Sequence, residues 1–216
     1  MIYCMADIHG DHDRYQKMLE KIAFSESDTL YIIGDIIDRG SDSVKILLDI
    51  MERENVRLIM GNHEYMCLST FDPLYDSYAF RLWMDNGGKK TFKDLKYKQT
   101  DEQRERILRY LRSLPYHLDI EVNGQAFYLV HGYPVGDLFE SLWSRPKPNA
   151  PAPFEEKTVI VGHTPTYLLP GPDSEEDGAT IWRGNGVIDI DCGCGHGLDC
   201  SRLACLCLDD MTEFYV

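Results

Sequence analysis

Residues 29–40 read TLYIIGDIIDRG, and the pattern of this stretch decides the fold class. Its first five residues form an apolar run of strand length, which ends at Gly34. Two acids, Asp35 and Asp38, and one base, Arg39, then stand between two glycines. Glycine permits a sharp turn or a close approach of the backbone to a ligand. The stretch therefore predicts a buried strand that delivers two carboxylates and a cation to a binding site.

The same arrangement occurs twice more in the first third of the chain. Apolar runs at 2–6 and 56–60 also end in polar clusters, and helical spacing predicts helices at 12–23 and 44–51 between the runs. Strands separated by helices pair in parallel through right-handed crossovers, so an α/β fold is expected. Ligands of such sheets bind beyond the carboxyl ends of the strands. The three polar clusters should therefore meet in one active site.

The rest of the chain adds a helical segment and further strands, and without a repeat or linker it predicts a single domain over residues 1–216. Residues 74–113 have helical spacing that is interrupted near Asn86-Gly87-Gly88. Asn123-Gly124 is a strong hairpin signal. Residues 134–172 hold eight of the ten prolines and should be mostly loop. Further strands are predicted at 117–122, 125–130, 158–161, 187–190, 203–208 and 213–216.

Residues with metal-binding chemistry follow several of these runs. Asp7 and His9 stand two apart after the first run, and should point the same way because strand side chains alternate. Carboxylate and imidazole together suit Mn, Fe or Zn better than Ca. Each cluster alone has an ordinary explanation, such as a loop hydrogen bond or a helix cap. Five clusters at strand ends favour a shared site. The other four are the acids of residues 34–40, Asn62 with His63, His131, and His163.

Composition limits the classes of partner. The 216 residues carry a net charge of -14, with 36 acids and 22 bases, which argues against a nucleic-acid surface. Bound cations would instead attract a phosphate locally. The apolar start is too short and lacks the basic residues of a signal peptide, and no apolar run approaches a membrane span. Seven cysteines, an odd number, fit reduced thiols, so a cytoplasmic protein without membrane contact is expected.

Taken in order, these motifs resemble the calcineurin-like metallophosphoesterases. The forms Gly34-Asp35-x-x-Asp38-Arg39-Gly40, Gly61-Asn62-His63-Glu64 and Gly162-His163-Thr164-Pro165 are similar to the serine/threonine protein phosphatase branch, with bacterial and bacteriophage lambda members nearest in size. The resemblance implies two mixed β-sheets packed as a central sandwich flanked by helices, with the active site at the carboxyl ends of the strands. It also implies hydrolysis of a phosphate ester by direct attack of a hydroxide that bridges two divalent metal ions, with Mn expected first and Fe or Zn as alternatives.

The resemblance also implies a role for each matching residue. Asp7, His9 and Asp35 would hold one metal ion, and Asp35 would bridge to a second ion, held also by Asn62, His131 and His163. His63, oriented by Asp38, would protonate the leaving oxygen. Phosphate would be bound by Arg39, Asn62 and Arg145, the last within Leu142-Trp143-Ser144-Arg145-Pro146.

Two departures from the family pattern bear on the substrate. Tyr133 stands after His131-Gly132, where relatives often have a small residue, and its ring could narrow the cleft. Thr164 and Pro165 follow His163, where many nuclease relatives place another His, which disfavours nucleic-acid hydrolysis. The expected substrate is phosphoserine or phosphothreonine in a protein, or a phosphorylated small molecule. The alternatives are symmetrical hydrolysis of diadenosine tetraphosphate and, in another class, a non-catalytic binding module; the sequence gives no oligomeric state.

Two segments near the carboxyl end have uses outside these motifs. Cys192, Cys194, Cys200, Cys205 and Cys207 lie beside His196 and could form a zinc site, but cysteines that alternate in an apolar strand, as at 205–207, favour packing. His196 is expected near the site without a role in it. The acidic stretch 173–177 is expected to be a solvated loop.

Overall fold

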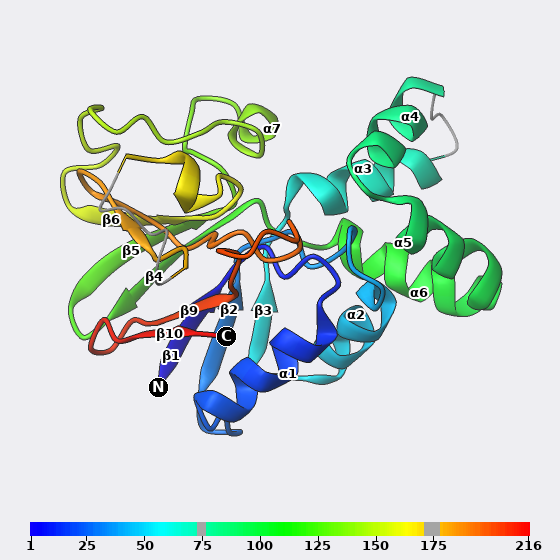
Figure 1. Cartoon of the computed structure of the whole chain (residues 1–216), viewed down its shortest axis with the longest axis horizontal. Helices are drawn as coiled ribbons and strands as arrows, with labels where there is room; N and C mark the ends of the chain where they lie inside the picture. The colour runs from blue at the N-terminus through cyan, green and yellow to red at the C-terminus, as the bar shows by residue number, and fades with distance from the viewer. Residues whose placement is uncertain (73–76, 171–177) are drawn as a thin grey trace.

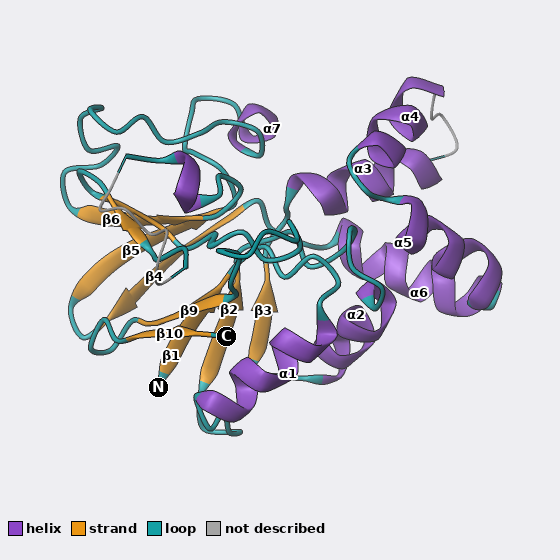
Figure 2. Cartoon of the chain, in the orientation of Figure 1, coloured by secondary structure: helices purple, strands orange, loops and turns teal. Residues whose placement is uncertain are grey.

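The computed structural model describes residues 1–72, 77–170 and 178–216. Two five-stranded sheets lie face to face and the larger helices gather to one side of them (Figures 1 and 2). This arrangement confirms the α/β class and the two mixed sheets that the family resemblance implied. The acidic stretch at 173–177 lies outside the described residues.

The first sheet contains the three strands expected at the start of the chain. Its order is β10 (Glu213–Tyr215), β9 (Ala204–Cys207), β1 (Ile2–Met5), β2 (Thr29–Ile32) and β3 (Val56–Leu58). Strands β1, β2 and β3 are parallel, as predicted, and β9 pairs antiparallel with β1. Because the three parallel strands share one direction, the loops that follow them gather at one end of the sheet (Figure 1).

Two helices cover the outer face of this sheet. They are α1 (His12–Lys21) and α2 (Ser43–Glu52), and both follow loops that leave the parallel strands. The side chain of Asp11 caps α1 by accepting a hydrogen bond from the backbone N–H of Arg14. Buried side chains of both helices, among them Tyr15 and Leu47, join Leu30 and Ile32 in one apolar core. The helically spaced apolar residues of the sequence are therefore the ones that pack on the sheet.

The second sheet is built from the later strands. Its order is β4 (His117–Val122), β5 (Gln125–Val130), β6 (Lys157–Val161), β8 (Val187–Asp189) and β7 (Trp182–Arg183). Asn123 and Gly124 turn the β4–β5 hairpin with φ angles of 51° and 80°, as the sequence predicted. Residues of both sheets, including Cys4, Leu206, Phe127 and Ile160, share a second core, and this core holds the two sheets together.

The predicted helical segment forms a lobe beside the sheets. Within the predicted range it comprises α4 (Ser77–Asp85), α5 (Lys89–Lys93), a π-helical turn (Asp94–Lys98) and α6 (Asp101–Arg112), and α3 (Asn62–Phe71), which precedes that range, joins the lobe. The interruption between α4 and α5 falls at residues 86–88, as expected. The stretch predicted to be loop also contains α7 (Leu138–Ser141) and a short 3₁₀ turn, Thr166–Leu168.

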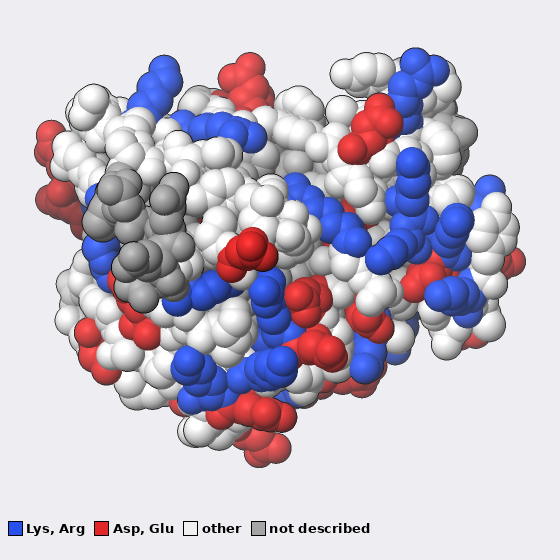
Figure 3. All heavy atoms as spheres, in the orientation of Figure 1, with Lys and Arg blue, Asp and Glu red and all other residues white. Residues whose placement is uncertain are grey.

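The surface and the helices give two further facts. Acidic and basic side chains are interspersed on the face shown in Figure 3. None of the helices in the described part of the chain combines the length and apolar character needed to cross a membrane.

Candidate metal centre

The backbone reaches the site through turns that L-amino acids rarely adopt. Asp7, His9, Asp35, Asp38 and Arg39 all have positive φ angles, of 49° to 76°. Such residues cost about 1–3 kcal/mol each, so the surrounding structure must hold them in place. The expectation that Asp7 and His9 share a direction through strand alternation was wrong, because β1 ends at Met5. Left-handed turns bring both side chains to the same cavity.

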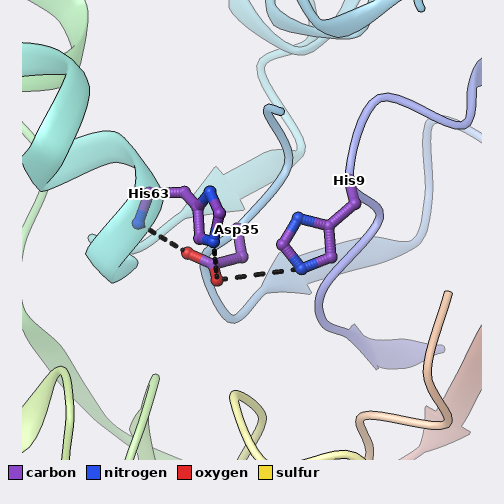
Figure 4. A group of neighbouring side chains, drawn as sticks. All are labelled: His9, Asp35 and His63. Carbon is purple, nitrogen blue, oxygen red and sulfur yellow. Dashed lines mark hydrogen bonds and ion pairs between the residues drawn. The ribbon is translucent and has the colours of Figure 1, made fainter. Parts of the chain in front are cut away.

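Asp35 lies at the middle of the site. Its Oδ2 atom is 3.2 Å from His131 Nε2, 3.8 Å from His63 Nε2 and 3.9 Å from His9 Nε2. Its Oδ1 atom accepts a hydrogen bond of 2.9 Å from the backbone N–H of His63 (Figure 4). The Asp35 carboxylate therefore belongs to two groups of three possible ligands, one with His9 and His63 and one with His131 and His163.

Asn62 and Asp7 extend these two groups. Asn62 Oδ1 lies 2.8 Å from His131 Nε2 and 3.0 Å from His163 Nδ1. Asp7 Oδ1 lies 3.8 Å from His9 Nε2, while Asp7 Oδ2 accepts a 3.0 Å hydrogen bond from the backbone N–H of His163. The structure thus brings together all six residues to which the resemblance assigned metal binding.

The hydrogen bonds of His9 and His131 leave the Nε2 atom of each ring free for a metal ion. The Nδ1 atoms of His9 and His131 face the carbonyl oxygens of Ile37 (3.1 Å) and Ile33 (2.8 Å). A carbonyl only accepts, so Nδ1 carries the proton in each ring and Nε2 presents a lone pair to Asp35. A lone pair that faces a carboxylate requires a cation or a proton between them.

The spacing of the donor atoms fits metal ions. Two ligands that bind one ion at about 2.1 Å and at right angles lie about 3.0 Å apart. The separations around Asp35 and Asn62 run from 2.8 to 3.9 Å. The residues present therefore fit a dinuclear centre, and nitrogen with oxygen donors suits Mn, Fe or Zn.

Electrostatics point in the same direction. Burial and the nearby Asp191 raise the pKa of Asp7 well above its usual value. Burial alone would raise the pKa of Asp35 as well, but His131 and His63 hold it well below its usual value. Burial would lower the pKa of His131, yet Asp35 raises it to about 10, so in the absence of an ion this position retains a proton. The buried carboxylates of Asp7 and Asp35 place negative charge in the interior, and bound cations would neutralise it.

His63 and Asp38 form the pair that the sequence predicted. His63 Nδ1 is 2.7 Å from Asp38 Oδ2, which also accepts a 2.6 Å hydrogen bond from the indole of Trp83. Burial would lower the pKa of His63, but Asp35 and Asp38 outweigh it and raise that pKa. His63 Nε2 points toward Asp35 and the cavity. The ring is held in one orientation and is able to carry a proton to a bound ligand.

Glu64 organises the loop that carries Asp35. Its buried carboxylate accepts hydrogen bonds from the backbone N–H groups of Asp35 (2.8 Å), Ile36 (3.0 Å), Gly61 (3.1 Å) and Ile37 (3.4 Å). Glu64 had no predicted role. A glutamate three positions after the N-cap residue, here Gly61, is the capping-box position, and this signal could have indicated it.

A cavity of about 240 Å³ opens over the centre. Arg39 and Arg145, the predicted phosphate-binding residues, both line it. It is also lined by residues that the sequence analysis left without a role in the site, namely Asn86, Trp143, Pro165, Leu168 and His196. Trp143 stands in the segment quoted for Arg145, and His196 was expected near the site, but their contacts in the cavity come from distant segments and give no local signal of a role.

The cysteines near the carboxyl end are free thiols in the structure. Cys192, Cys194, Cys205 and Cys207 are buried and contribute to the two main apolar cores. This is the packing role predicted for the alternating pair at 205–207.

Comparisons with known proteins agree with the site. Residues 1–199 match the family model described as calcineurin-like phosphoesterase. The serine/threonine-protein phosphatase 1 of Salmonella typhimurium is 30% identical over 157 residues, which cover 67% of this chain and 68% of that protein. The symmetrical bis(5'-nucleosyl)-tetraphosphatase of Delftia acidovorans is 41% identical over 70 residues, 32% of this chain and only 25% of that protein.

A solved structure matches the fold over the whole length of this chain. The metallophosphoesterase from Sphaerobacter thermophilus superposes with a TM-score of 0.60 at 17% identity, covering all of this chain and 87% of that one. At this identity the likeness concerns the fold alone. The match of the family model over most of the chain carries the assignment: this chain belongs to the calcineurin-like phosphoesterase family.

Proposed function

We propose that this chain is a metal-dependent phosphoesterase that hydrolyses phosphomonoesters, with phosphoserine and phosphothreonine in proteins as its substrates. The observation that carries the proposal is the position of Asp35, whose carboxylate is shared by two groups of histidines. Asp7, His9, Asp35, Asn62, His131 and His163 would hold two divalent ions. Such ions supply a hydroxide nucleophile near neutral pH and neutralise charge on a phosphate.

The remaining residues would act on the substrate. Arg39 and Arg145 line the cavity and would bind phosphate oxygens, with the amide of Asn62 beside them. His63, held by Asp38, would donate a proton to the leaving oxygen. The raised pKa of His63 favours the protonated form that this step needs.

Cavity size favours a phosphorylated side chain as the substrate. Pockets that bury drug-sized ligands measure about 300–1,000 Å³, and the cavity here is smaller, about 240 Å³. It has room for a phosphate and the short side chain that bears it, while the rest of a protein substrate stays outside. Of the two relatives described above, the protein phosphatase shares the longer stretch, 157 residues against 70.

Hydrolysis of a dinucleoside polyphosphate is the second candidate. A groove of about 560 Å³ adjoins the cavity at His9 and Arg39, and Lys17 and Lys90 line it. These cations could bind further phosphates of a polyphosphate chain. The higher identity to the tetraphosphatase, 41%, is consistent with this alternative.

The test is phosphate release by the Mn-loaded protein, with phosphoserine, phosphothreonine and phosphotyrosine peptides compared with diadenosine tetraphosphate. Asp35→Asn should abolish turnover, while Asp119→Asn, an exposed acid on β4, should leave it unchanged. Preference for the dinucleotide by orders of magnitude would move the assignment to the second candidate. Undiminished activity of Asp35→Asn would refute the metal-dependent mechanism. Absence of both metal and turnover would favour a binding module.

A further inference from the structure

A glycine-spaced loop crosses over the metal centre. Gly193, Gly195 and Gly197 alternate with other residues and have φ angles of 81°, 79° and 70°. A Cβ atom on Gly195 would lie 2.4 Å from the Cβ of His9, so only glycine allows the loop to approach this closely. The loop thereby places the side chain of His196 at the wall of the cavity.

His196 contacts the cation expected to bind phosphate. Its Nε2 atom lies 2.5 Å from a terminal nitrogen of Arg39, and its Nδ1 atom lies 3.1 Å from the hydroxyl of Tyr167. The other terminal nitrogen of Arg39 is 3.5 Å from Nε2 of His63. The Arg39 guanidinium therefore lies between the imidazoles of His196 and His63 in the wall of the cavity.

The direction of these hydrogen bonds follows from chemistry. A guanidinium has five N–H donors and no acceptor, so Nε2 of His196 must accept. The proton of the neutral ring is then on Nδ1, which donates to the oxygen of Tyr167. Arg39, His196 and Tyr167 thus form an ordered chain that starts at the arginine.

A neutral partner suits an arginine that must bind an anion. No carboxylate forms an ion pair with Arg39 in the part of the chain that the structure describes. A carboxylate would fix the side chain but would also compete with phosphate for the guanidinium. An imidazole fixes it while leaving its full charge available.

We propose that His196 is a positioning residue that holds the Arg39 guanidinium toward the phosphate subsite. The proposal rests on the proposed function in one respect, namely that phosphate binds at this centre. The proposal gives a role to a histidine that lies outside the family motifs. His196 would contribute to phosphate affinity and not to metal binding.

The test measures binding of inorganic phosphate to the Mn-loaded full chain by calorimetry, together with steady-state hydrolysis of p-nitrophenyl phosphate. His196→Ala should weaken phosphate binding and raise KM by about fivefold, with kcat changed less than about twofold, because an exposed charge-assisted hydrogen bond is lost. His196→Gln should restore most of the affinity, since its amide can accept from Arg39 and donate to Tyr167. Leu198→Ala, an exposed residue on the same loop, is the matched control and should bind like the parent.

A double-mutant comparison decides whether His196 acts through Arg39. In an Arg39→Ala background, His196→Ala should cause no further loss of phosphate affinity. An equal loss in that background, or lower Mn content in His196→Ala, would overturn the proposal. If no variant hydrolyses any ester but phosphate binding follows this pattern, the positioning role stands and the proposed function fails.

Discussion

At the scale of single residues, the histidines of the site differ in the hydrogen-bond partner of their Nδ1 atom. His9 and His131 donate from Nδ1 to backbone carbonyls and offer Nε2 to an ion. His63 instead directs Nδ1 to the carboxylate of Asp38, which supports a positive charge on the ring. The partner of Nδ1 therefore separates a possible ligand from a possible proton donor.

This distinction predicts how activity depends on the leaving group. His63→Ala should lower kcat about 100-fold or more for a phosphoserine peptide, because an alkoxide leaves poorly without a proton. The loss should be about tenfold or less for p-nitrophenyl phosphate, whose leaving group needs no proton. Parallel kinetics on both substrates test the assignment, and equal losses on the two would contradict a proton-donating role.

At the scale of elements, strands and helices were predictable because their signals are local. Apolar runs fixed β1, β2 and β3, and helical spacing fixed α1 and α2. The conformation of the turns that follow the strands was only partly predictable. Gly10 and Gly34 indicate turns, but the positive φ angles of Asp7, His9 and Asp35 themselves carry no signal in the sequence. The contact between His196 and Arg39 joins residues 157 apart in the chain, and no local pattern indicates such a pair.

The glycine-spaced loop allows a matched pair of substitutions. Gly195→Ala should destabilise the protein by about 2 kcal/mol or more and lower its Mn content, because it adds a clash with His9 to the strain of a positive φ. Gly197→Ala has a similar φ but open space around it, so only the strain of about 1 kcal/mol is expected. Denaturant unfolding and metal analysis compare the two. Equal effects would show that the approach to His9 is unimportant.

The contact between α1 and α2 should depend on pH. Asp49 on α2 accepts hydrogen bonds from the hydroxyl of Tyr15 on α1 and from Arg53. Burial would raise the pKa of Asp49, but the bonds to Arg53 and Tyr15 outweigh it and lower that pKa. A folded-state pKa below the unfolded value, about 3.9, gives stability that is present above that value and is lost as pH falls through the folded-state pKa.

Asp49→Asn should therefore lower the free energy of unfolding by about 1 kcal/mol at pH 7, and the difference from the parent should shrink as pH falls below about 4. Urea unfolding of metal-free protein across this range measures it. Glu121→Gln, which removes an exposed acid on β4 away from any helix end, is the control and should match the parent throughout. A difference that stays constant with pH would contradict the linkage.

At the scale of the whole molecule, a chain with a net charge of -14 places several of its acids in the interior. Asp7, Asp35, Asp189 and Asp191 are all at most 2% exposed. Divalent ions should therefore stabilise the fold and not only enable chemistry. At Mn concentrations 100 times the Kd, one site adds about 2.7 kcal/mol.

The melting temperature should accordingly rise by several degrees when Mn is added after chelation. Asp35→Asn should lose most of this rise, since both groups of histidines share that carboxylate. Calorimetric scans of the two proteins, with and without Mn, make the comparison. An equal rise in Asp35→Asn would show that the stabilising ions bind elsewhere.

The carboxylate of Glu64 has a consequence for how the centre is loaded. It fastens the loop after β2 to the start of α3 through four backbone N–H groups, and none of these bonds requires an ion. The ligands on those two segments are then already ordered when an ion arrives, so its capture costs little conformational entropy. Loading should be governed by how quickly the incoming ion sheds its water, and ions that exchange water rapidly would occupy the centre first.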